Sequence, residues 1–285
     1  MRSAFVCFFF AVAARADIAP DTFHGGTGLQ LDAKDAASSK AVAKIQMKKE
    51  RVTITLHHTA EGAFAVVDAT FHMTAPSPTK LRVVFPGAGV KVGEQFAVHP
   101  TLVGFRAFVD GKPVAVKDDE QTHTTKGGPP GREYSKRRTE TWHAFAAAVD
   151  DDTTIRVRYA LSSSGVNDNG YASVSYILHT GALWAKDIEE AILSVEAAGG
   201  VDLARTSLRT MAMPPVSFVS LSSDQPPPPV MPAGAVRSGS AITFTATHLE
   251  PTDKDDVEVV FPSSAPSSWG APSPALAALM LEAVR

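Results

Sequence analysis

The residues with the most capacity for chemistry in this sequence are its histidines, and two of them, His57 and His72, could share a metal ion. His57 lies in residues 52–58 and His72 in residues 63–73, two apolar-rich segments that we expect to pair as a hairpin. Imidazoles on one face of a hairpin can bind zinc or copper. His58 cannot join them, because neighbouring residues of a strand point to opposite faces. No acidic third ligand has a fixed place beside the pair, so we expect no metal and no cofactor. A metal-dependent module that uses His57 and His72 stays open as an alternative if the fold assembles the site.

Two acidic, turn-rich stretches contain the oxygen ligands that calcium prefers. They are residues 150–152 (DDD) and 167–170 (NDNG). Neither completes a twelve-residue calcium loop, because residues 171–173 already begin a strand after the second stretch. Turn formation accounts for both stretches, and we expect neither to bind calcium.

Hydrolytic chemistry would need a nucleophile or a pair of carboxyl groups in a defined setting. Residues 162–165 (SSSG) lack the sequence and the strand–turn–helix context of a nucleophile elbow. The adjacent carboxyls Glu189 and Glu190, like Asp255 and Asp256, would diverge on a strand or remain solvated on a loop. The sequence therefore assigns no catalytic residue. A secreted hydrolase stays open as an alternative if the fold assembles residues that are distant in sequence: His143, His179, Glu140 and Asp168.

Composition excludes other classes of protein. The chain has 285 residues and a formal net charge of -3, so it lacks the basic character that nucleic acids attract. It contains no phosphate-binding or dinucleotide-binding glycine motif. The basic run at residues 136–138 lies between Glu133 and Glu140, and we interpret it as solvated surface. We expect no nucleic-acid partner.

The N-terminus predicts export. Arg2 precedes an apolar run at residues 4–14, and Ala-Arg-Ala at 14–16 is typical of a signal-peptide cleavage site after Ala16. The run is too short to cross a bilayer, so we expect no transmembrane span in the mature chain. Cys7, the only cysteine, lies within this segment, and the mature chain would have no disulfide. This favours a bacterial protein of the periplasm, the cell surface or the medium.

The segments that must position these side chains are short β runs separated by turn residues. The runs are residues 52–58, 63–73, 80–85, 105–116, 139–149, 153–161, 171–178, 216–220, 241–249 and 256–261. Asp110-Gly111 suits a type I′ hairpin turn. Residues 184–198 also fit helical spacing, and we expect a strand in their second half. The pattern predicts an all-β fold, an antiparallel sandwich of two packed lobes.

The predicted organisation follows from these runs and from the polar stretches between them. A signal peptide (1–16) precedes an N-terminal β lobe (17–117), an exposed loop (118–138), a C-terminal β lobe (139–262) and a tail (263–285). The tail contains one short helix, with Ser273 as its N-cap and Pro274 at its first position. The loop from 118 to 138 has almost nothing to bury, which makes it the candidate recognition surface.

The most organised stretch is SYILHTGALW, residues 175–184. We interpret Tyr176, Thr180, Gly181 and Trp184 as a structural signature, in which the tryptophan closes one end of the sandwich. Trp142 and Tyr159 are candidates for the same layer, and His179 is interpreted as a surface residue at a strand end.

This stretch carries a resemblance to a known family. The pattern Y-x-L-x-T-G-x-x-W, with the strand pair ATFHMTAPSPTKLRVVFPG before it, resembles uncharacterised exported bacterial β-sandwich proteins over residues 43–196. The resemblance implies export and a sandwich fold but no activity and no catalytic residue. Ala185 and Lys186 depart from the glycine common after the tryptophan in that family.

Together these observations predict a non-catalytic binding or cell-envelope structural module. Its partner would be an envelope protein or a glycan, and no single ligand is indicated by the sequence.

Overall fold

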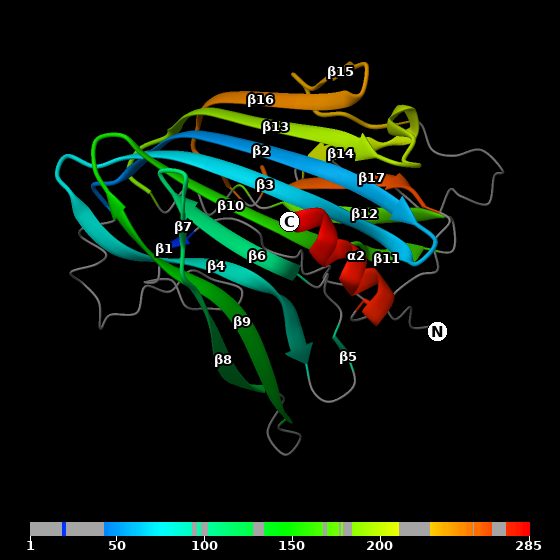
Figure 1. Ribbon diagram of the computed structural model, residues 1–285, viewed down its shortest axis with the longest axis horizontal. Helices are drawn as coiled ribbons and strands as arrows, with labels where there is room; N and C mark the ends of the chain where they lie inside the picture. Colours follow the sequence, from blue (N-terminus) through cyan, green and yellow to red (C-terminus); the bar gives the residue numbers. More distant parts are fainter. Residues whose placement is uncertain are drawn as a thin grey trace, which may run out of the picture.

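The protein forms three β-sheets and one C-terminal helix (Figure 1). The computed structural model describes residues 19–20, 43–92, 96–97, 102–127, 134–167, 170–176, 178, 184–210, 229–252, 254–263 and 272–285. The predicted signal peptide and the predicted strand at 216–220 lie outside these residues. The all-β class and the C-terminal helix are confirmed.

The largest sheet has eight strands in the order β15-β16-β13-β2-β3-β10-β6-β7. Their bounds are Val236–Ser238 (β15), Ala241–Leu249 (β16), Ile188–Ala198 (β13), Gln46–Thr59 (β2), Gly62–Thr74 (β3), Thr153–Ser162 (β10), Leu102–Val109 (β6) and Lys112–Val114 (β7). Neighbouring strands run antiparallel except β13 and β2, which run parallel. This pair differs from the predicted antiparallel arrangement. A parallel pair needs a long crossover, which here spans the whole chain between the two strands.

Two smaller sheets accompany it. One has the order β11-β12-β17-β14, with bounds Ser164–Asn167, Tyr171–Tyr176, Val257–Pro262 and Ser207–Thr210. The other has the order β1-β4-β9-β8, with β5 also on β4; the bounds are Ala19–Pro20 (β1), Thr79–Val92 (β4), Tyr134–Val149 (β9), Val116–Gly127 (β8) and Phe96–Ala97 (β5).

Alternating burial places the core on one face of the large sheet. In β2, Val52, Ile54 and Leu56 are buried, as their period of two predicts. One continuous apolar cluster joins them to residues of the smaller sheets such as Phe145 and Val259. The three sheets therefore share one core.

The predicted Asp110-Gly111 turn is confirmed between β6 and β7. Both residues have positive φ, 50° and 73°, as a type I′ turn requires. The Asp110 carboxylate also accepts a hydrogen bond from the Thr154 backbone N–H at 2.9 Å, which ties the turn to β10.

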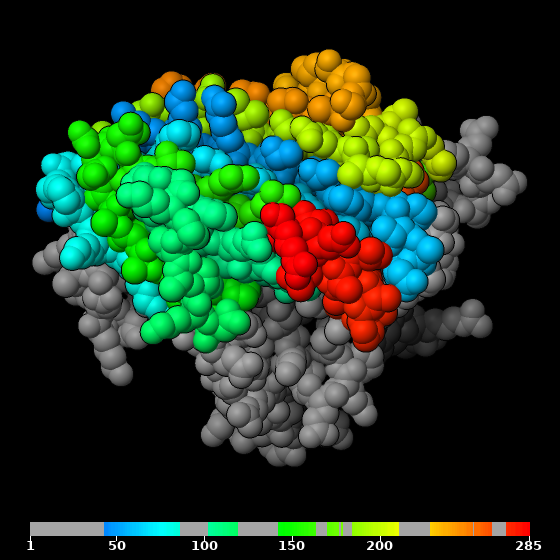
Figure 2. Space-filling view, viewed as in Figure 1, coloured from blue at the N-terminus to red at the C-terminus, as the bar shows by residue number. Residues whose placement is uncertain are grey.

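The helix α2, Pro274–Val284, lies on the other face of the large sheet, over β3, β6 and β10. Ser273 caps it by accepting a hydrogen bond from the Leu276 N–H at 3.1 Å, as predicted. Its buried side chains form a separate apolar cluster with β3 and β10: Leu276, Met280 and Val284 on Phe64, Val66 and Ala160. Figure 2 shows α2 (red) lying as a ridge on this surface. Among the described helices, none has both the length and the apolar character needed to span a membrane.

The structure corrects the prediction of a loop at 118–138. Described residues of this range belong to β8 and β9, which pair with each other as a long hairpin. The division into lobes 17–117 and 139–262 stays a prediction, and the large sheet counts against it. That sheet takes β2, β3, β6 and β7 from the first range and β10, β13, β15 and β16 from the second.

Candidate functional site

The strands that end the sheets differ sharply in length. The eight-stranded sheet ends in β15 and β7, of three residues each, and the four-stranded sheet ends in β11 and β14, of four residues each. The remaining sheet ends in β1, of two residues, and in β8, of 12 residues. An edge strand presents unpaired N–H and C=O groups. The short terminal strands also leave parts of their neighbours without a strand partner, but within the described residues these stretches have at most six residues, as at 85–90 of β4 and 244–249 of β16. At 3.4 Å per residue, β8 offers roughly 40 Å of edge.

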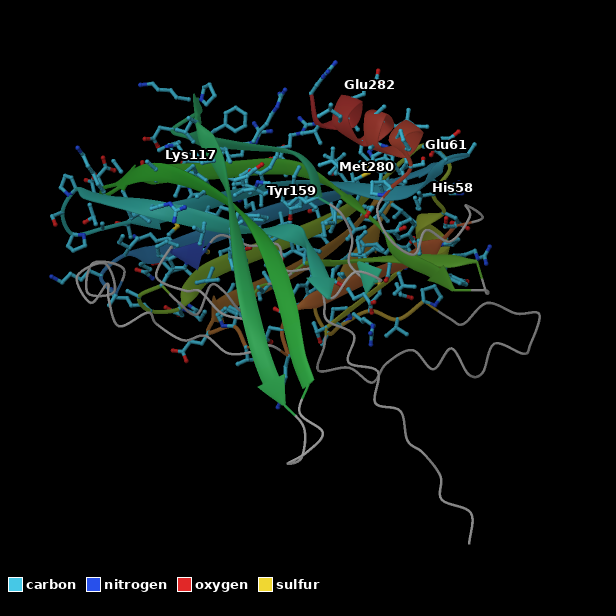
Figure 3. The ribbon with its side chains drawn as sticks, turned by 90° about the horizontal axis from the view of Figure 1, so that it is seen from below. His58, Glu61, Lys117, Tyr159, Met280 and Glu282 are labelled. Atoms are coloured by element: carbon cyan, nitrogen blue, oxygen red, sulfur yellow. The ribbon has the colours of Figure 1, made fainter. Side chains whose placement is uncertain are left out.

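The β8–β9 hairpin leaves the body of the protein. Its register runs from Val116 opposite Phe145 to Gly127 opposite Tyr134. Strand β4 pairs with β9 only as far as Arg138, so the last part of β9 pairs with β8 alone within the described residues. Figures 1 and 3 show the two strands projecting beyond the other sheets, and Figure 3 labels Lys117 near the start of β8.

A histidine–carboxylate pair lies at the base of this hairpin. His143 Nδ1 is 2.6 Å from Asp118 Oδ1, and the two residues are register partners on β9 and β8. Because an ionised carboxylate only accepts hydrogen bonds, the imidazole donates. The His143 side chain is 13% exposed and that of Asp118 67%. The pair therefore marks the border between the core and solvent.

Aromatic rings hold the imidazole on its other side. Phe105 stacks on His143 with ring centroids 4.7 Å apart and an interplanar angle of 11°. Phe85 lies 5.0 Å from Phe105 and 5.1 Å from Tyr159, centroid to centroid. These residues come from β4, β6, β9 and β10, so the base of the hairpin is fixed to two sheets at once.

A β-bulge directs Phe105 into this cluster. Arg106 pairs with Arg158 and Val103 with Ala160, so two residues of β6 oppose Tyr159 alone. Gly104, the first of them, has a φ of +71°. Val103 then packs towards α2, whereas Phe105 packs into the main core. Bulges commonly re-aim side chains in this way.

The metal candidates His57 and His72 are not brought together. Their strands pair as predicted, but His57 lies opposite Phe64 and His72 opposite Lys49. Eight residues of β2 separate the two positions, roughly 27 Å along the strand. His57 instead stacks on Phe64 at 4.4 Å, and burial lowers the pKa of its imidazole. No group of three or more potential metal ligands occurs within the described residues.

The described residues of the stretch 175–184, with Ala185 after it, contact the start of β2 and Asp256. Tyr176 and Trp184 are both buried. The Ala185 N–H donates to the Ile45 carbonyl at 2.7 Å, and the Leu178 N–H donates to Asp256 at 3.0 Å. His179, Thr180 and Gly181 lie outside the described residues. Trp142 belongs to a small cluster separate from the one that holds Trp184 and Tyr159, so it does not share their layer.

A buried carboxyl that the sequence analysis missed lies beneath this stretch. Glu50 on β2 is fully buried and accepts a hydrogen bond from the Tyr176 hydroxyl at 2.8 Å. Burial raises the pKa of Glu50 from 4.5 to about 8. A signal was available, because Glu50 shares the period-two face of Val52 and Ile54.

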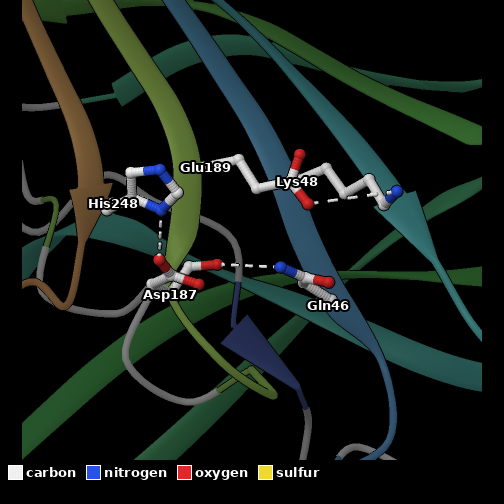
Figure 4. A network of polar contacts seen from close by, with 5 residues as sticks. All are labelled: Gln46, Lys48, Asp187, Glu189 and His248. Carbon is white, nitrogen blue, oxygen red and sulfur yellow. Dashed lines mark hydrogen bonds and ion pairs between the residues drawn. The ribbon is translucent and has the colours of Figure 1, made fainter.

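A polar network outside the core joins β2, β13 and β16 (Figure 4). Gln46 donates to the Asp187 carbonyl at 3.1 Å, and His248 Nδ1 lies 2.8 Å from the Asp187 carboxylate. Lys48 lies 3.9 Å from Glu189. Exposed pairs of this kind contribute little stability, and we interpret the network as structural.

The hydrolase candidates are only partly placed. His143 pairs with Asp118, which the sequence analysis had assigned to a loop. Glu140 lies opposite Gln121 in the hairpin register. Asp168 and His179 lie outside the described residues. In the part of the chain that the structure describes, no hydroxyl group is hydrogen-bonded to His143, so no nucleophile–base pair forms there.

The first calcium candidate lies at a turn, and of the second only Asn167 and Gly170 are within the described residues. The Asp150 carboxylate accepts hydrogen bonds from Thr153 Oγ1 at 2.8 Å and from the Asp152 N–H at 3.2 Å. These bonds lower the pKa of Asp150 and use its oxygens within the turn. Asn167 ends β11, and Gly170 follows with a φ of +75°.

Comparison with known proteins gives no family. No protein-family model matches the chain, and no curated protein matches it. The resemblance to exported sandwich proteins therefore stays a prediction.

Solved structures show distant likeness. A "putative nutrient binding protein" from Legionella pneumophila is 18% identical, with a TM-score of 0.48, over 77% of this chain and 68% of that one. The M1 zinc metallopeptidase of Deinococcus radiodurans is 12% identical, with a TM-score of 0.34, over 77% and 42%. Yeast LTA4 hydrolase is 9% identical, with a TM-score of 0.37, over 77% and 29%. The chain thus spans less than half of either enzyme, and at these scores the likeness carries no functional conclusion.

Proposed function

We propose that this protein is an exported, non-catalytic binding module that captures its partner with the β8–β9 hairpin. One observation carries the proposal: β8 is a 12-residue edge, whereas elsewhere in the described sheets at most six consecutive strand residues lack a strand partner on one side, as at 85–90 of β4 and 244–249 of β16. A long open edge is a liability for solubility unless it serves recognition.

The base of the hairpin supports this role. Recognition elements work best when a rigid scaffold positions them. Asp118, His143 and Phe105 attach the hairpin to the core, while its outer part projects past the neighbouring sheets (Figure 3). A projecting element with a fixed base loses little entropy when it meets a partner.

Shortening the hairpin tests the proposal. Gln121 and Glu140 are register partners, so an Asn-Gly turn can replace residues 122–139 without breaking the inner pairs. In a matched control, the same Asn-Gly turn replaces only residues 128–133 and connects Gly127 to Tyr134, which are also register partners. Both variants start at Asp17.

The readout is cross-linked capture from envelope extract, followed by rebinding of the purified partner, either a protein or a glycan. We expect the intact chain and the control to bind one partner with similar Kd and the shortened variant to lose it. Equal binding by the shortened variant, with its thermal unfolding unchanged, would overturn the proposal.

Export has its own test. The N-terminal pattern of Arg2, the apolar run and Ala14-Arg15-Ala16 supports it. Residues 1–20 fused to a reporter that is active only outside the cytoplasm should give activity, and the mature chain should begin at Asp17. A full-length chain retained in the cytosol would contradict export.

The His143–Asp118 pair favours a second candidate, a hydrolase in which the carboxylate orients the imidazole. Hydrolysis of an ester, peptide or glycoside by the wild type that His143→Asn abolishes would establish this alternative. Activity that His143→Asn leaves unchanged would exclude His143 as its base.

A further inference from the structure

We infer that the edge of β8 binds an acidic peptide segment in extended conformation, as an added strand. This inference rests on the proposed function and names the chemistry of the partner. It draws on two independent features of the hairpin, its open main-chain edge and its uneven charge.

The open edge provides the main-chain part of recognition. Strand addition needs several consecutive residues, because backbone hydrogen bonds supply the affinity. β8 ends its sheet over residues 116–127 and pairs, within the described chain, with β9 alone. The other open stretches of the described sheets reach at most six consecutive residues, as at 85–90 of β4 and 244–249 of β16, half the length of β8.

The charges of the hairpin divide it into two halves. The inner part of β8 carries Asp118, Asp119 and Glu120. The outer half, residues 122–127 of β8 and their partners 134–139 of β9, contains no acidic residue and four cations: Lys126, Lys136, Arg137 and Arg138. The register brings residues 136–138 of β9 opposite residues 123–125 of β8. The outer half is thus cationic in a chain whose net charge is -3.

This division selects the partner and its register. Cations along the outer half attract an acidic strand, and like charge at the inner half repels the same strand. An acidic segment therefore pairs best beside residues 122–127. These residues also lack proline, so none of them is barred from a strand ladder.

A second copy of this chain is the competing occupant, because its own acidic stretch at 118–120 could lie beside the cationic half in an antiparallel pair. A free peptide needs only the width of one strand, about 5 Å, beside β8. A second copy must bring its whole body, and its Asp118 is already bonded to His143. The geometry therefore favours a peptide.

The test uses an eight-residue peptide of alternating Glu and Val with blocked ends, labelled for fluorescence anisotropy. Two peptide controls replace Glu by Lys, or N-methylate alternate backbone amides and so keep the charge while removing strand hydrogen bonds. The protein variant is K136E/R137E/R138E. Its matched control, K112E/K254E/R285E, makes the same charge change at exposed positions elsewhere.

We expect the acidic peptide to bind wild type and control alike, to bind the hairpin variant at least about tenfold more weakly, and to protect β8 amides from hydrogen exchange. The Lys peptide and the N-methylated peptide should not bind. Failure of the acidic peptide to bind, or equal binding of the N-methylated peptide, would overturn strand addition.

The outcomes also separate this inference from the proposed function. A partner captured through the hairpin in the shortening experiment, without any peptide binding, would leave the function standing and remove the inference. Capture by the shortened variant would remove the function. A dimer that K136E/R137E/R138E dissociates would assign the edge to a second copy and overturn the peptide.

Discussion

The outer face of the large sheet and the edge of β8 are covered to different degrees. α2 covers the apolar part of this face, where its Leu276 and Met280 pack on Phe64 and Val66. The edge of β8 has no cover among the described residues. Apolar surface is hidden, whereas main-chain hydrogen-bonding groups remain available, so the molecule is arranged for selective pairing rather than for unspecific apolar association.

The hydrogen bonds follow the same division. Inside the body, Tyr176 donates to a fully buried Glu50, and Leu178 donates to the buried Asp256. At the hairpin, the corresponding bond joins His143 to an Asp118 that is mostly exposed. Buried polar pairs specify the body, because an unsatisfied group there is costly, whereas the exposed pair only positions an appendage.

The largest expected effect separates the body from the hairpin. Phe85→Ala removes a fully buried ring that contacts Phe105 and Tyr159, and should lower the free energy of unfolding by about 3–5 kcal/mol. Replacing residues 122–139 by Asn-Gly should change it by about 0.5 kcal/mol or less. Urea denaturation measures both. A similar loss for the two variants would show that the hairpin belongs to the cooperative core.

The second prediction concerns pH within the body. Glu50 has a pKa of about 8 in the native state against 4.5 as an ordinary glutamate, so the folded protein keeps a proton that the unfolded chain releases. Its contribution to stability is fully present below pH 4.5 and is lost as the pH rises towards 8, by at most about 1.4 kcal/mol per pH unit. Glu50→Gln keeps an acceptor for Tyr176 and should flatten this dependence.

Urea denaturation at pH 5, 6.5 and 8 checks the flattening, with the exposed Glu196→Gln on β13 as the control. The protection of β8 and β9 amides against hydrogen exchange, relative to the intrinsic rate at each pH, should change less with pH than that of β2 and β12 amides. A wild-type slope retained in Glu50→Gln would show that Glu50 is ionised in the native state.

Local patterns predicted much of the body. Val52, Ile54 and Leu56 follow the alternation that made β2 predictable, and Asp110-Gly111 and Ser273 act through turn and cap chemistry that a few residues define. Glu50 obeys the same alternation, but its charge obscured its place on the buried face. Such features are local, so the sequence alone carries them.

The hairpin could not be predicted in this way. Residues 118–138 show no apolar alternation, because most of the hairpin has no core to face, and its strands form through pairing with each other. The Asp118–His143 contact joins residues 25 positions apart and depends on the register of that pairing. The parallel pairing of β13 with β2 is likewise a property of the whole topology.

The third prediction removes the cover of the outer face. Leu276→Ala should lower the free energy of undocking α2 from the sheet by about 2 kcal/mol. This is the lower end of the range for a buried Leu→Ala change, because the helix lies at the surface and can move into the space left by the side chain. An isolated helix of 11 residues is marginal, so α2 should fray when its seat is lost. Hydrogen exchange of the α2 amides should speed up while β8 amides stay unchanged, and the exposed Glu282→Ala should alter neither. Equal exchange of the α2 amides in the wild type and in Leu276→Ala would contradict a role of Leu276 in holding α2 on the sheet.

The smallest expected effect lies at the joint between the two regions. Asp118→Asn replaces a carboxyl acceptor by an amide, and because the Asp118 side chain is 67% exposed the free energy of unfolding should fall by less than about 1 kcal/mol. Exchange of amides near the base of the hairpin should nevertheless accelerate, by up to about fivefold, since 1.4 kcal/mol corresponds to a factor of ten. Lys117→Gln, at the neighbouring exposed position, is the control. If global stability fell while local exchange stayed the same, Asp118 would act as part of the body, and the contrast between a closed core and an attached hairpin would not hold.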